Sequence, residues 1–287
     1  METRHYELLL AAVIMARSSS YLFSKICLQS MGAFTLLAIR FLLALFGRKL
    51  KGITPHTAVR GVILGTIFFA VMAAELGGLR TTDSAAASFL ENTAIVFVPF
   101  IEAVLHKKAP GSRVLLCGAL TLAGVGLLTI RDGGFALRTG ELLCLLAAGL
   151  YAVAIIATDR FSHSDDPLAL GVIQVGVIGL LGLAAAMLLE RPQLPAARTE
   201  WGCILYLSIV CTGFGFTLQP LAQSRTSAEK AGMFCAFNPL TASVLGVVFL
   251  HEGFAWTHVL GAALILCSIV VYGRYKARGV PARGRAG

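Results

Sequence analysis

Ionisable residues inside long apolar stretches are the features of this sequence best suited to chemistry. Arg17, Arg40, Glu75 and Glu91 all lie within such stretches. A charge at the centre of a bilayer costs about 2.5–3.5 kcal/mol on insertion scales, so such residues are usually functional. A carboxyl that alternates between a dry cavity and the vicinity of an arginine can take up and release a proton.

The functional hypothesis rests on two of these residues. We predict that Glu91 is a protonatable gate, with Arg17 as its partner or as the counter-charge for a substrate carboxylate. Glu75 is expected on the same pathway. The alternative is a static Arg17–Glu91 or Lys25–Glu75 pair that fixes helix packing. For Arg40 we expect bonds to backbone carbonyls, or a side chain that reaches back to the interface.

Three uncharged polar residues, Asn92, Gln219 and Asn238, are further candidates for the substrate or ion pathway. Gln219 and Asn238 each precede a proline. A proline removes a backbone donor and frees carbonyls to face a cavity, although it can also produce a simple kink. Transporters built from inverted repeats place their sites at such breaks. The predicted helix breaks are at Pro99, Pro220 and Pro239.

The composition places the chain among polytopic membrane proteins. Hydrophobic residues make up 57% and charged residues only 14% of its 287 residues, and the mean hydropathy is +0.80. A soluble domain usually has about 25% charged residues. The net charge of +9 does not indicate a nucleic-acid partner, because the basic residues sit in short loops and at the C-terminus. The expected partners are the lipid bilayer and a small-molecule substrate.

The chain reads as a duplicated unit. Most of its apolar segments reach the ~20 residues that cross a bilayer. Two segments, 80–106 and 225–252, are related by the identities Arg80/Arg225, Thr81/Thr226, Ala86/Ala231, Phe89/Phe234, Leu105/Leu250 and His106/His251. The ten expected spans are 6–28, 34–47, 57–78, 84–105, 113–130, 139–158, 168–189, 201–221, 229–250 and 255–273.

Ten spans divide into two units of five. Since five is odd, the second unit must enter the membrane in the opposite orientation, which makes an inverted repeat. We therefore predict an all-α integral membrane protein with ten transmembrane helices in two inverted five-helix repeats. The first repeat covers residues 1–131, the second covers 138–275, and 276–287 form a basic cytoplasmic tail.

The distribution of basic residues predicts the orientation. Most lysines and arginines fall on one side, in the N-terminus, the 48–60 and 106–113 loops and the C-terminal tail. By the positive-inside rule, both termini are cytoplasmic in a multi-pass protein of the plasma or inner membrane.

Motifs for catalysis, cofactors or metals are absent from the sequence. It contains no GxxxxGK[ST] loop, no G-x-S-x-G elbow and no HExxH. The seven cysteines form no CxxC or Cys/His spacing and behave as small apolar residues. We expect no enzyme activity, no cofactor and no metal site, and close glycine packing in the fifth and tenth spans.

Several stretches carry a resemblance to a known family: SSSYLFSKICLQSMGAFTLLAIRFLLA (18–44), LRTTDSAAASFLENTAIVFVPFIEAVL (79–105), QPLAQSRTSAEKAGMFCAFNPLTASVLGVVFLHE (219–252) and GAALIL (261–266). On these residues the chain resembles the EamA-type ten-helix exporters of the drug/metabolite transporter superfamily. The resemblance implies two inverted EamA repeats, often assembled as a homodimer, that move small metabolites or drugs by alternating access. The chain departs from the family pattern at Arg17, Glu75 and Glu91.

Together these features predict a secondary-active exporter of amino acids or amphipathic drugs, coupled to protons. An uncoupled facilitator or exchanger of the same substrates is the main alternative, and a permanent Arg17–Glu91 pair would favour it. A membrane-embedded enzyme or interaction protein is a second alternative, but the sequence lacks the convergent acid, base or nucleophile that an enzyme needs.

Overall fold

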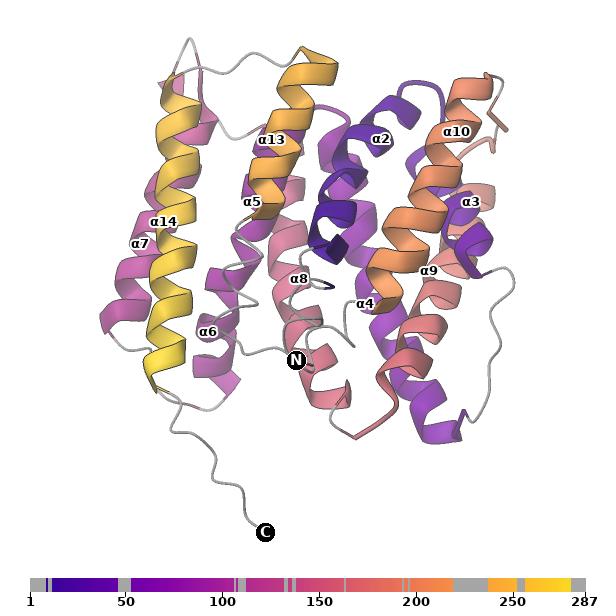
Figure 1. Cartoon of the computed structure of the whole chain (residues 1–287), viewed down its shortest axis with the longest axis horizontal. Coiled ribbons are helices and arrows are strands. Elements are labelled where there is room, and N and C mark those ends of the chain that lie inside the picture. Colours follow the sequence, from indigo (N-terminus) through magenta and orange to yellow (C-terminus); the bar gives the residue numbers. More distant parts are fainter. Residues whose placement is uncertain are drawn as a thin grey trace.

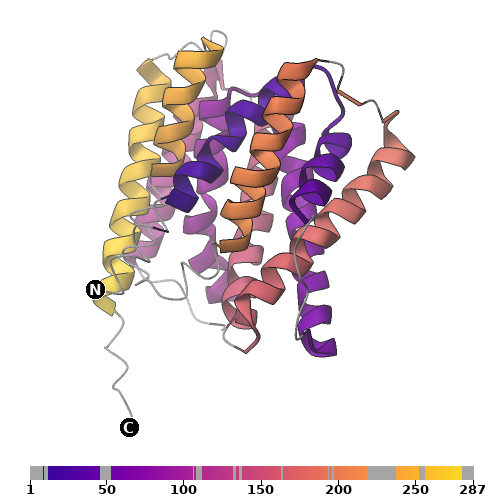
Figure 2. The same cartoon turned by 45° about the vertical axis from the view of Figure 1, so that its right-hand side comes forward.

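The computed structural model describes residues 9, 12–45, 53–105, 107, 112–131, 134–135, 138–162, 164–192, 194–195, 197–218, 237–251 and 256–279. Long apolar helices stand side by side, and α14 packs against α7 at one edge of the bundle (Figures 1 and 2). The elements in chain order are α2 (Ser20–Cys27), α3 (Ala33–Leu45), α4 (Pro55–Leu79), α5 (Ser84–Asn92), α6 (Ala94–Leu105), α7 (Ser112–Thr129), β1 (Ile130–Arg131), β2 (Gly134–Phe135), α8 (Thr139–Ser162), α9 (Pro167–Leu189), α10 (Arg198–Tyr206), the π-helix η1 (Leu207–Phe216), α13 (Phe237–Leu250) and α14 (Trp256–Gly279).

The predicted all-α membrane-protein class is confirmed, apart from the short hairpin that β1 and β2 form. Within the described residues, the helices long and apolar enough to cross a membrane are Pro55–Leu79, Thr139–Ser162, Pro167–Leu189 and Arg198–Phe216. Ala33–Leu45, Ser84–Val98, Leu115–Leu127 and Val259–Val271 are apolar but shorter. The arrangement of ten spans in two repeats therefore stays a prediction.

Two of the long helices start at strong sequence signals. Thr54 caps α4 by accepting a hydrogen bond from the Thr57 backbone N–H, and Asp166 caps α9 in the same way through Leu168. A proline occupies the first position of each helix, where its missing N–H costs nothing.

Polar contacts at the ends of α4 fix the directions of its neighbours. Near its start, Thr57 and Arg60 contact Asp165, which precedes α9. Just after its end, Arg80 lies 4.0 Å from Glu190, which follows α9. Helices α4 and α9 therefore run in the same direction. We call the end with Asp165 the clasp end of the bundle, and the end with Glu190 the pocket end.

Helix α3 runs opposite to α9, because its first turn meets the last residue of that helix. The Glu190 carboxylate accepts hydrogen bonds from the backbone N–H groups of Phe34 and Thr35, at 3.2 and 3.0 Å, and from the Thr35 hydroxyl at 2.9 Å. One carboxylate thus satisfies donors at the start of α3 that the helix itself leaves unpaired.

Close glycine contacts hold the long helices together, as expected for spans rich in small residues. A Cβ at Gly78 of α4 would lie 2.7 Å from the Gly140 carbonyl oxygen of α8. A Cβ at Gly124 of α7 would lie equally close to the Gly261 carbonyl of α14. The predicted close packing of the fifth and tenth spans is confirmed.

Asp165 joins the start of α4 to the α8–α9 turn. Its carboxylate accepts hydrogen bonds from the Thr57 hydroxyl at 2.7 Å and the Arg60 guanidinium at 2.6 Å, and His56 Nδ1 lies 3.4 Å away. The Thr57 bond above all, with those from Arg60 and His56, holds the pKa of the Asp165 carboxyl below its ordinary value.

Replacing Asp165 with Asn should therefore destabilise the protein in a pH-dependent way. Because the folded-state pKa is lowered, the stabilisation is present above the unfolded pKa of about 3.9 and is lost as the pH falls through the folded value. At pH 7 we expect the thermal midpoint in detergent to drop by about 2–4 °C. The difference from the wild type should shrink below about pH 4, and a difference that persists there would contradict the assignment.

Candidate functional site

Two buried carboxyl groups meet in the middle of the bundle. Glu75 lies on α4 and Glu91 on α5, each only 4% exposed. The two carboxyl groups lie within hydrogen-bonding reach of each other. An ionised carboxylate has only acceptor atoms, so a hydrogen bond between two carboxyls requires a proton between them. The pair is therefore a place where the protein can hold one proton.

A tyrosine completes the coordination of this pair. The Tyr21 hydroxyl, on α2, donates a buried hydrogen bond of 2.5 Å to Glu91 Oε2. Hydrogen bonds of this length to a carboxylate are among the strong ones. Glu91 thus receives a hydroxyl from one helix and lies against the Glu75 carboxyl of another.

Arg17 lies close to the carboxyl pair and binds an aromatic wall. Its guanidinium donates to the Tyr151 hydroxyl of α8 at 3.1 Å and lies 4.4 Å from the centre of the Phe216 ring. A guanidinium over an aromatic face is attracted by the ring quadrupole. Gly215 makes this approach possible, since a Cβ there would lie 2.9 Å from Arg17 Cγ.

Further rings extend this wall. The Phe68 ring lies 6.1 Å from that of Tyr151 and 5.8 Å from that of Phe216, and the Phe41 ring lies 5.5 Å from Phe216. Edge-on contacts of this kind are favourable geometries for aromatic pairs. The result is an apolar wall with the Arg17 guanidinium on it.

The wide turns of η1 position two of these groups. A π-helix is rare and is found mostly at functional sites. Thr212, within η1, accepts a 2.6 Å hydrogen bond from Arg40 Nε, and Phe216 is its last residue. Arg40 is only 2% exposed and does not reach back to the interface. Its described polar partner is a side-chain hydroxyl rather than the expected backbone carbonyl.

The other predicted site residues have different surroundings. Asn92 donates to the Ser88 carbonyl one turn earlier in its own helix, at 2.8 Å. Lys25 donates to the Thr82 carbonyl at 3.0 Å and lies 3.8 Å from Asp83. Gln219 and Pro220 lie outside the described residues. For Asn238 and Pro239 the structure describes the backbone, within α13, and not the side chains.

The break in the fourth predicted span lies at Thr93, not at Pro99. Helix α6 continues through position 99, whereas α5 ends at Asn92. The Thr93 hydroxyl and backbone N–H both bond to the Leu90 carbonyl, three residues back, which tightens the turn and ends α5.

Sequence reasoning missed three contributors to the site. Tyr151 was not singled out, although it is a tyrosine within an otherwise apolar span, which is a usable signal. Thr212 and the π-helix carry no such signal. Tyr21 and Phe216 stood among many aromatic residues, and only packing identifies them.

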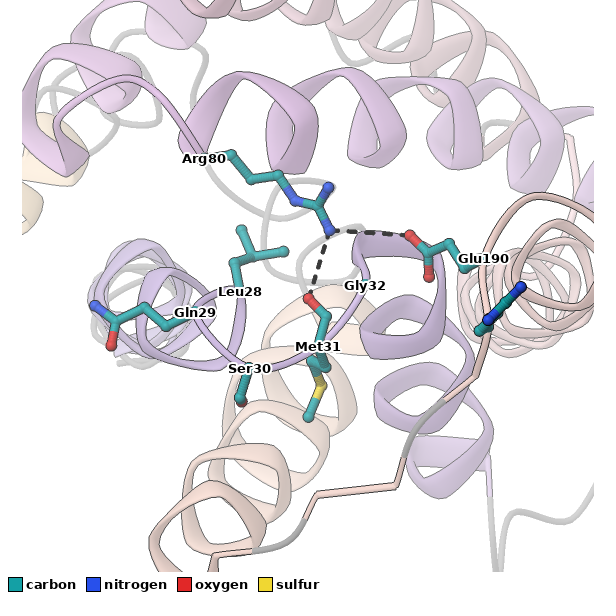
Figure 3. Close-up of a pocket in the computed structure, with 8 residues that line it drawn as sticks. Leu28, Gln29, Ser30, Met31, Gly32, Arg80 and Glu190 are labelled. Atoms are coloured by element: carbon teal, nitrogen blue, oxygen red, sulfur yellow. Dashed lines mark hydrogen bonds and ion pairs between the residues drawn. The ribbon is translucent and has the colours of Figure 1, made fainter.

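The pocket end carries an open pocket of about 430 Å³ between α2, α3, α4 and α9. Figure 3 shows the Arg80 guanidinium between the Met31 carbonyl and the Glu190 carboxylate, at 3.5 and 4.0 Å. A Cβ at Gly32 would overlap the Glu190 carboxylate, so a larger residue there would require the Glu190 side chain to move. The pocket is bordered by a polar contact that ties three helix ends together.

Comparison with known proteins finds a family match over the second half of the chain. Residues 138–274 match the profile of the EamA-like transporter family, so the chain carries an EamA family domain there. An uncharacterized transporter of Archaeoglobus fulgidus is 26% identical over 91% of this chain and 83% of that protein, and the uncharacterized transporter YcxC of Bacillus subtilis is 27% identical over 88% and 87%.

More distant comparisons agree with this EamA assignment. A protein named biotin transporter, from Escherichia coli, is 21% identical over 80% of this chain and 77% of its own length. A solved crystal structure superposes with a TM-score of 0.70 at 19% identity, covering 96% of this chain and 98% of that one, which shows a shared fold. The family match, the relatives named as transporters and the apolar helices together support a multi-pass membrane transporter.

Proposed function

We propose that this chain is a proton-coupled secondary exporter of small amphipathic metabolites, such as amino acids, or of drugs. The observation that carries the proposal is the buried contact between the Glu75 and Glu91 carboxyls. A pair that holds one proton in a dry interior releases it when water or a charged substrate reaches it. Proton release can then be linked to the substrate's passage.

Arg17 and the aromatic wall define the substrate class. The guanidinium suits a carboxylate, and the rings of Phe68, Tyr151 and Phe216 suit an apolar or aromatic body. The carboxyl pair suits a cation, so a zwitterion with an apolar side chain satisfies all three. The relative named a biotin transporter supports a small carboxylate as substrate.

Alternating access follows from the proposed inverted repeats, residues 1–131 and 138–275, with the tail 276–287 beyond them. Counterpart helices in such repeats must run in opposite directions. In support, α3 runs opposite to its proposed counterpart α9, and α7 runs opposite to α14, as the Thr121–Ser268 and Gly124–Gly261 contacts require. The family profile also covers the length of one repeat.

Membrane placement is part of the proposal. We place the chain in the plasma or inner membrane with both termini on the cytoplasmic side, because the basic loops lie there. The clasp end is then cytoplasmic and the pocket end external. A homodimer is the assembly that the family resemblance favours.

An uncoupled facilitator is the second candidate. The 2.5 Å Tyr21–Glu91 bond favours it, because a carboxylate held permanently by a hydroxyl would not cycle its proton. Proteoliposomes with an internal pH dye separate the two. Influx of a radiolabelled amino acid or organic cation that rises with an outward proton gradient and alkalises the lumen supports coupling, and influx indifferent to the gradient would leave only the facilitator.

Arg17 provides a test of the substrate side. Replacement by Met removes a charged hydrogen-bond donor, so uptake of an anionic or zwitterionic substrate should fall by about tenfold to a hundredfold. Arg17→Lys keeps the charge but not the planar contact with Phe216, and should lose less. Initial rates at several concentrations measure this. Equal rates for a carboxylate substrate in the wild type and Arg17→Met would remove Arg17 from the binding site.

A further inference from the structure

Two buried serines lie beside the carboxyl site, one on each of the helices that form the Tyr21–Glu91 contact. Ser24, on α2, is 1% exposed, and Ser88, on α5, is 0% exposed. Neither hydroxyl has a hydrogen-bond partner among the residues that the structure describes. A serine in a helix normally bonds to the carbonyl four residues back, as Ser208 does with Ile204 at 2.7 Å.

The pairing of α2 with α5 places both serines on one route, which leads from the Lys25–Asp83 contact to the carboxyl pair. At one end Tyr21 contacts Glu91, and at the other Lys25 contacts Thr82 and Asp83, so the two helices run in opposite directions. Ser24 follows Tyr21 by three residues, and Ser88 precedes Glu91 by three residues, a rise of about 4.5 Å along either helix. Both hydroxyls therefore lie between the carboxyl pair and the Lys25–Asp83 contact.

This route reaches the surface at the pocket end. The side chains of Lys25 and Asp83 are 21% and 38% exposed, whereas Ser24 and the α5 residues from Ser84 to Glu91 are buried. Exposure thus falls along the route from the surface to the proton-holding pair.

The helices around this route add charged groups only at its two ends. Helix α13 packs against both α2 and α5 and carries no ionisable residue between Phe237 and Leu250 (Figure 1). Helix α4 contributes Glu75 and α8 contributes Tyr151, both at the inner end of the route. Helix α8 also carries the buried Glu141, next to Gly140, where a Cβ would lie 2.5 Å from the Thr82 hydroxyl. Among the described residues, the charged groups near the route are therefore Glu75, Glu91 and Arg17 at one end and Lys25, Asp83 and Glu141 at the other.

We propose that Ser24 and Ser88 bind a short file of water molecules that connects the pocket end with the Glu91 carboxyl. Buried hydroxyls without protein partners are the groups that ordered water satisfies. Each oxygen of the file accepts a proton from one neighbour and passes another to the next, so one O–H bond forms and one breaks at every link. A proton that enters at the surface end therefore releases a different proton to the carboxyl, and the file keeps its composition. This role in proton delivery rests on the proposed function, whereas the water site itself does not.

Radiolytic hydroxyl labelling of the full chain in lipid nanodiscs tests the water site without any substrate. Radicals form from bound water, so Tyr21 should be oxidised despite being only 3% exposed, and Phe41, which is 0% exposed, should not. Rates are corrected for the intrinsic reactivity of each side chain and read by mass spectrometry. In the double variant Ser24→Ala, Ser88→Ala we expect Tyr21 oxidation to fall about fivefold or more.

The matched control is Ser208→Ala, which removes a buried hydroxyl that already has a partner and should leave Tyr21 oxidation unchanged. Tyr21 oxidation as slow as that of Phe41 in the wild type would overturn the water site. So would an unchanged rate in the double alanine variant.

A transport measurement separates this inference from the proposed function. If the wild type shows gradient-driven uptake, the double alanine variant should slow it while keeping substrate exchange, and an unchanged rate would overturn the delivery role. If Tyr21 is labelled but the wild type ignores the gradient, the water site stands and proton coupling fails.

Discussion

Glu91→Gln is expected to abolish gradient-driven uptake while substrate exchange continues. Glutamine has nearly the shape of glutamate, and it can accept from the Tyr21 hydroxyl and donate to the Glu75 carboxyl. The packing around the site should therefore survive. What disappears is the ability to take up and release a proton at this position, so uptake driven by a pH gradient should fall by about tenfold or more, to the rate seen without a gradient.

The measurement compares two assays on the same proteoliposomes. Uptake driven by a pH gradient reports the coupled cycle, and counterflow exchange at equal pH reports binding and the change of access alone. Glu200→Gln is a matched control, because that carboxylate accepts a bond from the Ala197 backbone, which glutamine can also do. Should the Glu91 variant respond to the gradient as the wild type does, the carboxyl pair is structural and the facilitator is correct.

Gly78→Val is expected to give the largest loss of stability. A Cβ at this position would lie 2.6 Å from the Cys144 sulfur and 2.7 Å from the Gly140 carbonyl oxygen. The carbonyl belongs to the backbone of α8, so the clash cannot be relieved by rotating a side chain. Overpacking of this kind costs about 1–3 kcal/mol, and more where the backbone must move. We expect the thermal midpoint to fall by about 5 °C or more, with low yield of folded protein.

Gly149 provides a control on the facing helix, away from the close contact. It lies on α8, and a Cβ there would meet nothing within 4 Å. Gly149→Ala should leave the midpoint unchanged or raise it slightly, because alanine favours the helix by up to about 1 kcal/mol. If Gly78→Val and Gly149→Ala unfold at the same temperature in a thermal-shift assay in detergent, α4 and α8 do not approach as closely as described.

The Gly78 variant also connects packing with function. Glu75 lies one turn before Gly78 on α4, so forcing α4 away from α8 displaces one member of the carboxyl pair. A variant that still folds should therefore lose gradient-driven uptake as well. This outcome would show that the position of the Glu75–Glu91 carboxyl pair depends on residue 78 having no side chain.

The membrane-protein class could be predicted from the sequence, because the composition is apolar and poor in charge. The same property makes the few charged residues inside apolar spans stand out as candidates for the site. Glu75 and Glu91 stood out as acids in apolar spans, and the structure brings them together. Their partners were not predictable. Tyr21 and Tyr151 acquire their roles through contacts across 70 and 134 residues, which no local pattern encodes.

Helix irregularities were the other features that sequence reasoning could not place. A proline signals a break, yet the chain bends at Thr93, where a hydroxyl competes for a backbone carbonyl. The π-helix over Leu207–Phe216 has no sequence signature, since its wide turns depend on what packs against it, including Arg17 against Gly215.

The two polar contacts at opposite ends of α4 have a mechanical consequence. Asp165 fastens the start of this helix to the turn before α9, and the Arg80–Glu190 contact fastens its end to the residue after α9. The same Glu190 carboxylate accepts hydrogen bonds from the first turn of α3. Sliding α4 along α9 would break both contacts at once, so α3, α4 and α9 are expected to move as one rigid unit. For the alternating access proposed above, we expect the change to come from helices outside this unit. These include α2, α5 and η1, which carry Tyr21, Glu91 and Phe216.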